Sequence, residues 1–128
     1  MAFEVKGLAH IGVFVKDVEA SVKFYRDILG FTVTDKADVG SKLVFANAGT
    51  CLLELIQPKE YKPRVPGQVD HIAIEVKGIE EMRAYLEEKG VKVPAEVGVM
   101  PNLLGGVKNI FFEGPDGERI ELFEYTGR

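Results

Sequence analysis

An internal repeat constrains this chain more than any other feature of its sequence. Residues 10–33 read HIGVFVKDVEASVKFYRDILGFTV, residues 71–93 read HIAIEVKGIEEMRAYLEEKGVKV, and the two segments align with a single gap. The chain's two histidines, His10 and His71, fall on the same position of this alignment. A repeat of this kind predicts two copies of one structural unit, each built from several strands and helices.

Each copy is predicted to begin with a strand and to continue with a helix. Residues 10–15 and 71–76 alternate in polarity with period two, which is typical of half-buried strands. Asp17 is a favourable residue to cap the first helix, and Gly30 and Gly90 are typical helix stops. Further strands are expected at 31–35, 42–47 and 51–57 in the first copy and at 91–93, 107–113 and 118–125 in the second.

The resulting fold class is α+β, with two βαβββ modules in one chain. We expect a single domain over residues 1–128, made of module 5–57 and module 68–127, because this length suits one globular core. A connector with three prolines joins the modules and is expected to be extended.

Charge and cysteine content exclude several classes of partner. The formal net charge is −4, which gives no general attraction to nucleic acid or to anionic membranes. The single Cys51 cannot form an internal disulfide, and it is expected to be a buried apolar residue. The sequence begins without a signal-peptide pattern and has no apolar stretch near ~20 residues. We therefore expect a cytoplasmic protein without nucleic-acid or membrane partners.

Each module also carries one glutamate on its last predicted strand. The segment LLELI, with Glu54, corresponds to RIELF, with Glu121. Alternation places His10 on the face opposite the apolar row, so its side chain is free to meet these glutamates. Two histidines and two glutamates, brought together about an approximate twofold axis, suit a divalent metal such as Ni, Co, Zn, Mn or Fe.

Each of these four residues also has a purely structural interpretation. A lone histidine in a strand more often makes ordinary hydrogen bonds than metal bonds, and Glu121 shares a face with Arg119, to which it can form a salt bridge. Glu54 lies among leucines, where an unpaired carboxylate would be costly to desolvate, so a cation is a natural partner. Glu124 lies on the other face of its strand and is the weaker ligand candidate.

From His10 to Tyr125 the sequence resembles the vicinal oxygen chelate superfamily. This group includes glyoxalase I, bleomycin and fosfomycin resistance proteins, extradiol dioxygenases and methylmalonyl-CoA epimerase. The segments HIGVFVKDVEASVKFYRDILGF and GPDGERIELFE carry the resemblance. It implies two βαβββ modules that form a curved mixed sheet around a metal, with Ni, Co or Zn ahead of Mn or Fe. The ligands that it implies are His10, Glu54, His71 and Glu121.

A set of four ligands resembles the sets found in the glyoxalase I and epimerase branches of the superfamily. These branches remove a proton from a carbon next to a carbonyl and stabilise the enediolate with the metal. By this resemblance Glu121 is the principal base, and Glu54 is the second carboxylate ligand and a candidate proton donor. The implied assembly is a homodimer with its sites at the interface between subunits.

The predicted activity is that of a glyoxalase I-like lyase or isomerase acting on a small carbonyl substrate, free or as a thiol adduct. Three alternatives stay open: an epimerase of the methylmalonyl-CoA type, a metal-free protein that binds an antibiotic or another small molecule, and a dioxygenase. Metal analysis distinguishes the metal-free binding protein from the other candidates, and oxygen consumption would identify a dioxygenase.

Substrate contacts are expected from residues that neighbour the predicted ligands. Phe14 shares a face with His10, Arg119 and Phe123 share a face with Glu121, and Lys108 is a cation for an anionic substrate tail. Phe14 and Pro58 stand where bacterial glyoxalase I-like proteins carry the Arg and Asn that contact glutathione, so glutathione use is doubtful. Gly105 and Gly106 are interpreted either as a mobile lip or as part of an ordinary loop.

Overall fold

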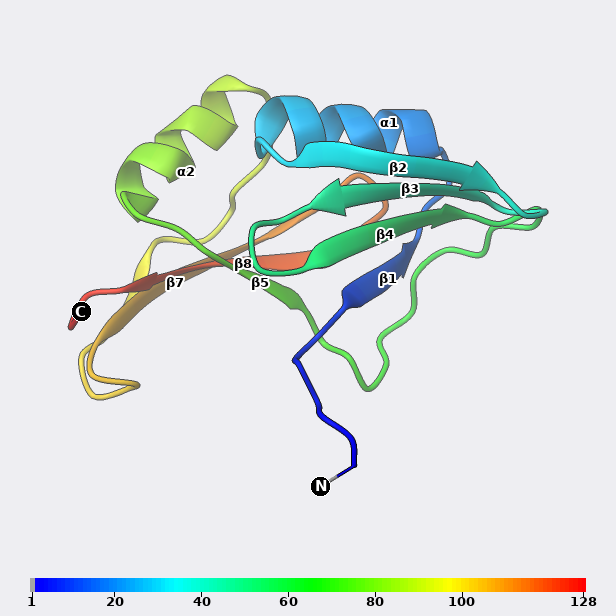
Figure 1. Cartoon of the computed structure of the whole chain (residues 1–128). Helices are drawn as coiled ribbons and strands as arrows, with labels where there is room; N and C mark the ends of the chain where they lie inside the picture. Colours follow the sequence, from blue (N-terminus) through cyan, green and yellow to red (C-terminus); the bar gives the residue numbers. More distant parts are fainter. Residues whose placement is uncertain (1) are drawn as a thin grey trace. The chain divides into compact units, whose positions relative to one another are not determined.

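Two compact units make up the chain in the computed structural model, which describes residues 2–128 (Figure 1). One unit extends to Pro63 and the other starts at Arg64, within the predicted connector. Each contains one four-stranded mixed sheet and one helical segment. The predicted α+β class and the repeated βαβββ order are therefore confirmed, whereas the single-domain boundaries stay a prediction.

The first unit places its first and last strands side by side. Its elements are β1 (His10–Phe14), α1 (Val18–Val22), the π-helix η1 (Lys23–Ile28), β2 (Thr32–Asp38), β3 (Lys42–Asn47) and β4 (Leu52–Gln57). The strand order is β1-β4-β3-β2, with β1 parallel to β4 and the other neighbours antiparallel. This topology brings the start and the end of the module together.

Apolar side chains between the helix and one face of the sheet form the core of the first unit. Val15, Val18 and Leu55 are almost completely buried there. The backbone N–H groups of Glu19 and Ala20 donate to the Asp17 side chain, so the predicted cap is present. A second cap comes from β4, where Gln57 Oε1 accepts from the Val18 N–H at 2.9 Å.

The second unit repeats this arrangement. It contains β5 (Ile72–Glu75), α2 (Ile79–Glu88), β6 (Gly98–Met100), β7 (Val107–Glu113) and β8 (Arg119–Tyr125), in the sheet order β5-β8-β7-β6. Strand β5 runs parallel to β8, as β1 does to β4. Glu124 Oε1 accepts from the Ile79 N–H at 2.9 Å, which matches the bond from Val18 to Gln57 in the first unit. Glu124 therefore caps a helix instead of facing the candidate ligands.

The strand predicted at 91–93 is wrong, because the second strand of this module is β6, which lies further along the chain. The Val91 N–H donates to Leu86 O, as part of the end of α2. Arg83 donates from its guanidinium to the carbonyls of Val93 and Ala95. These bonds give the Val91 N–H and the carbonyls of Val93 and Ala95 hydrogen-bond partners without a neighbouring strand.

Two smaller expectations are also changed by the structure. Cys51 is half-buried just before β4, not fully buried. Gly106 is buried and donates to Leu103 O, while its own carbonyl accepts from the Thr126 N–H at 2.9 Å. These bonds favour an ordinary ordered loop over a mobile lip. Among residues 2–128, none of the helices has the length and apolar character needed to span a bilayer.

Candidate metal centre

His10 and Glu54 meet on the face of the first sheet that points away from α1. They come from the adjacent strands β1 and β4, where Gly12 lies opposite Glu54 in the register. Alternation sends Leu53 and Leu55 into the core, so Glu54 projects to the other face with His10. His10 Nε2 lies 3.4 Å from Glu54 Oε1. The predicted pairing of these two residues is present within one unit.

His71 and Glu121 form the equivalent pair in the second unit. His71 immediately precedes β5, and Glu121 lies on the neighbouring strand β8. His71 Nε2 lies 3.1 Å from Glu121 Oε1, and the glutamate is buried. Each unit thus holds one histidine nitrogen and one carboxylate oxygen close together; we call each pair a half-site.

A phenylalanine supports the histidine of each half-site. The rings of His10 and Phe45 are 5.9 Å apart, those of His71 and Phe111 are 5.2 Å apart, and both pairs meet edge to face at 87°. Phe45 pairs with Glu54, and Phe111 pairs with Glu121, in the strand registers. The sequence interpretation missed both rings. They lie nine and ten residues before their glutamates, so an alignment on the glutamates matches them only with a gap in the turn.

The histidine of the second half-site has a partner on its other nitrogen. His71 Nδ1 lies 2.8 Å from the carboxylate of Asp70, which also pairs with Arg119. The hydrogen bond from His71, together with Arg119, lowers the pKa of Asp70 below its ordinary value. With the proton of a neutral imidazole held on Nδ1 by this carboxylate, Nε2 keeps the lone pair that a metal needs.

The purely structural interpretation of Glu121 expects a salt bridge with Arg119. In the structure these two residues do not pair. The Arg119 guanidinium bonds to Asp70 and lies over the Phe111 ring, 3.8 Å from the centroid. Glu121 instead accepts from the side-chain amide of Asn109, whose Nδ2 is 2.8 Å from Glu121 Oε2. The second half-site is thus held by a network that the sequence did not suggest.

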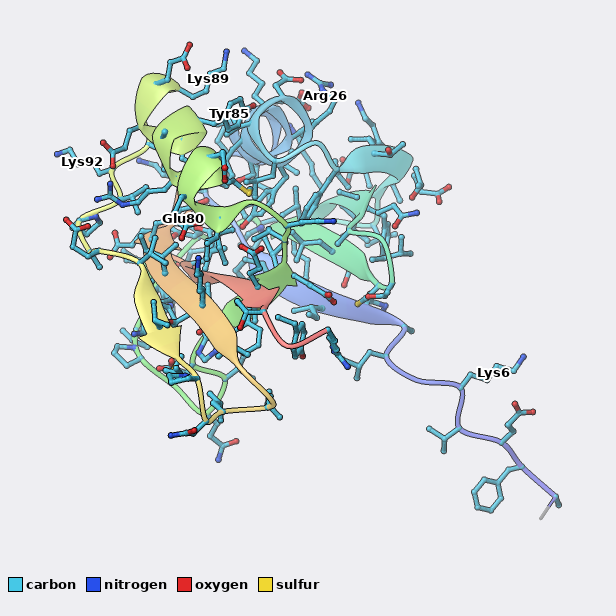
Figure 2. The ribbon with its side chains drawn as sticks, turned by 90° about the vertical axis from the view of Figure 1, so that its left-hand side faces the viewer. Lys6, Arg26, Glu80, Tyr85, Lys89 and Lys92 are labelled. Carbon is cyan, nitrogen blue, oxygen red and sulfur yellow. The ribbon has the colours of Figure 1, made fainter. Side chains whose placement is uncertain are left out.

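The other predicted substrate residues are divided between the two faces of the sheets. Phe14 is 66% exposed on the same face as His10. Phe123 lies on the Glu121 face, with its ring 5.3 Å from that of Tyr125. Lys108 instead alternates to the α2 side, where its Nζ is 2.6 Å from the carboxylate of Glu80. Glu80 lies at the start of α2, as Figure 2 shows. The structure therefore does not bring Lys108 together with the candidate ligands.

The donor atoms of each half-site have the spacing expected of two ligands to one ion. Metal bonds of about 2.0–2.1 Å at angles between 90° and tetrahedral place two ligand atoms about 2.8–3.4 Å apart. The observed separations are 3.4 Å and 3.1 Å. Across the described residues, His, Cys, Asp and Glu side chains form no group of three or more that suits a metal ion. Each unit by itself therefore offers two candidate ligands.

A family model identifies the superfamily of this chain. The model of the Glyoxalase/Bleomycin resistance protein/Dioxygenase superfamily matches residues 7–122. The chain belongs to this superfamily, as its sequence resemblance implied.

Individual relatives differ in the activities that their names describe. A "Probable lactoylglutathione lyase" from Synechocystis is 32% identical over 94% of this chain and 97% of its own length. The mitochondrial methylmalonyl-CoA epimerase of Bos taurus is 30% identical over 70% of this chain and 57% of its own length. Among solved structures, a glyoxalase family protein from Enterococcus faecalis has a TM-score of 0.78 and 27% identity, covering 93% of this chain and 98% of its own.

Proposed function

We propose that this protein is a metal-dependent, glyoxalase I-like lyase or isomerase that moves a proton at a carbon next to a carbonyl. The observation that carries the proposal is the matched pair of half-sites, each with a histidine nitrogen and a carboxylate oxygen 3.1–3.4 Å apart. In this proposal His10, Glu54, His71 and Glu121 hold one divalent cation together, with Ni, Co or Zn as the favoured metals. The Synechocystis relative named as a lactoylglutathione lyase supports the same class.

A bound divalent cation would draw electron density from the substrate carbonyl and make the neighbouring C–H bond more acidic. Glu121 is proposed as the base: its Oε1, the oxygen that faces His71 Nε2, would leave the cation and accept the proton. Glu54 is proposed as the second carboxylate ligand and as the group that returns a proton. Asp70 keeps His71 in the tautomer that binds through Nε2.

Apolar side chains on the ligand faces indicate a substrate with an apolar part. Phe14 and Phe123 are proposed to contact it, because they share their faces with His10 and Glu121 respectively. Arg119 is engaged with Asp70, so its contribution to binding is proposed to be indirect. We also propose that the protein acts as a homodimer, which light scattering tests directly: a monomer with full metal occupancy would contradict it.

The decisive experiment combines a substrate panel with one conservative variant. Protein loaded with Ni²⁺, Co²⁺ or Zn²⁺ is supplied with 2-oxoaldehydes, alone and with several thiols, and product formation is followed together with solvent deuterium incorporation. Glu121→Gln is expected to lose turnover by a factor of about 10² or more while it still binds metal. Undiminished turnover in Glu121→Gln would overturn the assignment of the base.

A second candidate is an epimerase of an acyl-CoA, which uses the same elementary proton transfer. The bovine methylmalonyl-CoA epimerase, 30% identical over 70% of this chain, favours it. An epimerase would introduce solvent deuterium into an acyl-CoA whose constitution does not change, whereas the lyase or isomerase would form a new compound. The same deuterium assay therefore separates the two reactions.

A further inference from the structure

The Asn109–Glu121 hydrogen bond depends on a glycine in the edge strand of the second sheet. Asn109 on β7 lies opposite Gly98 on β6 in the register. A Cβ atom at position 98 would lie only 2.5 Å from Asn109 Oδ1. The φ angle of Gly98 is not in the left-handed region, so it is the space above its Cα, and not backbone strain, that favours glycine here. Asn109 fills this space with its oxygen while its nitrogen reaches Glu121.

The first unit differs at both of these positions. Phe45 and Phe111 lie opposite the two glutamates, so Leu43 is the equivalent of Asn109. Ala37 lies opposite Leu43, in the place that Gly98 has in the second unit. Where the amide is present the opposite residue lacks a side chain, and where leucine replaces the amide a Cβ is present. The sequence of one chain thus contains both versions of the arrangement.

We infer that Asn109 is a positioning residue for Glu121, and that Gly98 provides the space that it requires. Asn109 Nδ2 binds Glu121 Oε2 at 2.8 Å, which leaves Oε1 as the oxygen that faces His71 Nε2. The carboxylate therefore presents one defined oxygen to a metal or to a substrate proton. This inference rests on the proposed function and specifies which half-site is preorganised for it.

The chemistry of an amide suits this role better than that of a charged donor. A lysine or arginine at position 109 would hold the carboxylate but would repel a divalent cation bound beside it. An asparagine side chain holds one oxygen through a neutral N–H and does not itself titrate. Outer-shell partners of this kind typically change metal affinity or activity by about 10- to 100-fold when they are removed.

The variants that test the inference are copied from the first unit. Asn109→Leu reproduces Leu43, and Gly98→Ala reproduces Ala37 while it leaves the asparagine in place. Val99→Ala, on the same edge strand but at an exposed position, is the control. Each full-length variant is purified without metal and titrated with Co²⁺, with the affinity and the visible absorption spectrum as readouts, and its folding is checked by thermal unfolding.

We expect Asn109→Leu and Gly98→Ala to bind Co²⁺ about 10- to 100-fold more weakly than wild type, with altered spectra. The double variant should bind about as weakly as Asn109→Leu alone, because Gly98 acts through the asparagine. Val99→Ala should match wild type. A purely structural hydrogen bond would change the unfolding temperature and leave the Co²⁺ spectrum as it is.

The outcomes separate this inference from the proposed function. If the wild type binds Co²⁺, and Asn109→Leu and Gly98→Ala bind it with the same affinity and spectrum, only the positioning role is overturned. A further loss in the double variant beyond that of Asn109→Leu would overturn the part assigned to Gly98. Failure of the wild-type protein to bind Co²⁺ would overturn both the proposed metal centre and the inference that rests on it.

Discussion

The two half-sites present the same pair of ligands but hold them in different ways. In the second, Asp70 binds the far nitrogen of the histidine and Asn109 binds the far oxygen of the glutamate. Their equivalents in the first are Ala9 and Leu43, whose side chains have no hydrogen-bonding group. The exposed side-chain fractions follow the same trend, at 46% and 17% for His10 and Glu54 and 33% and 8% for His71 and Glu121.

This difference shows that a repeated module need not repeat the side chains that surround its candidate ligands. The donor atoms of the side chains determine which ligands a metal can have. Preorganisation of those ligands depends on the residues that hydrogen-bond to them. A buried and hydrogen-bonded carboxylate keeps its position, and a more exposed carboxylate is freer to move. The comparison therefore predicts a fixed half-site in the second unit and an adaptable one in the first.

The largest effect is expected from substitutions in the two cores. They test whether the units are packed as similarly as they are folded. Leu55 and Leu122 each follow a candidate ligand glutamate and are fully buried. Leu55→Ala and Leu122→Ala are each expected to reduce the free energy of unfolding by about 2–5 kcal/mol, measured by urea denaturation. A nearly neutral result for one of them would show that the likeness of the two units does not extend to their packing.

The next effect concerns the partner of His71. Asp70→Ala copies Ala9 of the first unit and removes the acceptor on His71 Nδ1. We expect Co²⁺ affinity to fall by about tenfold or more, measured by titration of the metal-free protein. The reverse change, Ala9→Asp, is the matched comparison and should not weaken binding. Equal affinities of Asp70→Ala and wild type would contradict the asymmetry.

A smaller effect separates the two helix caps. Gln57 shares the start of α1 with Asp17, whereas Glu124 caps α2 beside Gly78, which has no side chain. Glu124→Ala is expected to reduce the free energy of unfolding by about 1 kcal/mol, and Gln57→Ala by less. Thermal unfolding of both variants provides the measurement, and a larger loss in Gln57→Ala would reverse the interpretation.

The smallest effect is that of the pair between Lys108 and Glu80. The hydrogen bond from Lys108 lowers the pKa of Glu80, so the pair stabilises the fold above the ordinary glutamate pKa and ceases to do so as pH falls through the lowered value. Lys108→Met should therefore lower the unfolding temperature slightly at neutral pH and hardly at all in strong acid. An equal decrease at both pH values would mean that charge is not responsible.

The repeat alone was enough to predict the βαβββ order and the pairing of His10 with Glu54 and of His71 with Glu121. Period-two alternation determines which face each of these side chains occupies, so the prediction needed little tertiary information. The prediction misplaces the second strand of the second module, because Arg83 and the end of α2 satisfy backbone groups near Val93.

The supporting residues could not be found in the same way. Asp70 and Asn109 lie at positions where the two modules differ, and a search for matching residues passes over such positions. The sequence places Glu124 on the right face, whereas Lys108, predicted as a substrate contact, pairs with Glu80 instead. The partners of both residues, Ile79 and Glu80, depend on how α2 lies against β8 and β7. Contacts of this kind are set by packing across elements, which a single sequence does not reveal.

Metal content after purification without chelators decides whether His10, Glu54, His71 and Glu121 hold one ion. Elemental analysis is applied to the wild-type protein and to His10→Ala and His71→Ala, with folding verified by circular dichroism. We expect a stoichiometric divalent metal in the wild type and its loss in both variants, because the proposed ion takes two ligands from each half-site. A wild-type protein without metal, or full occupancy after removal of either histidine, would contradict the proposed metal centre.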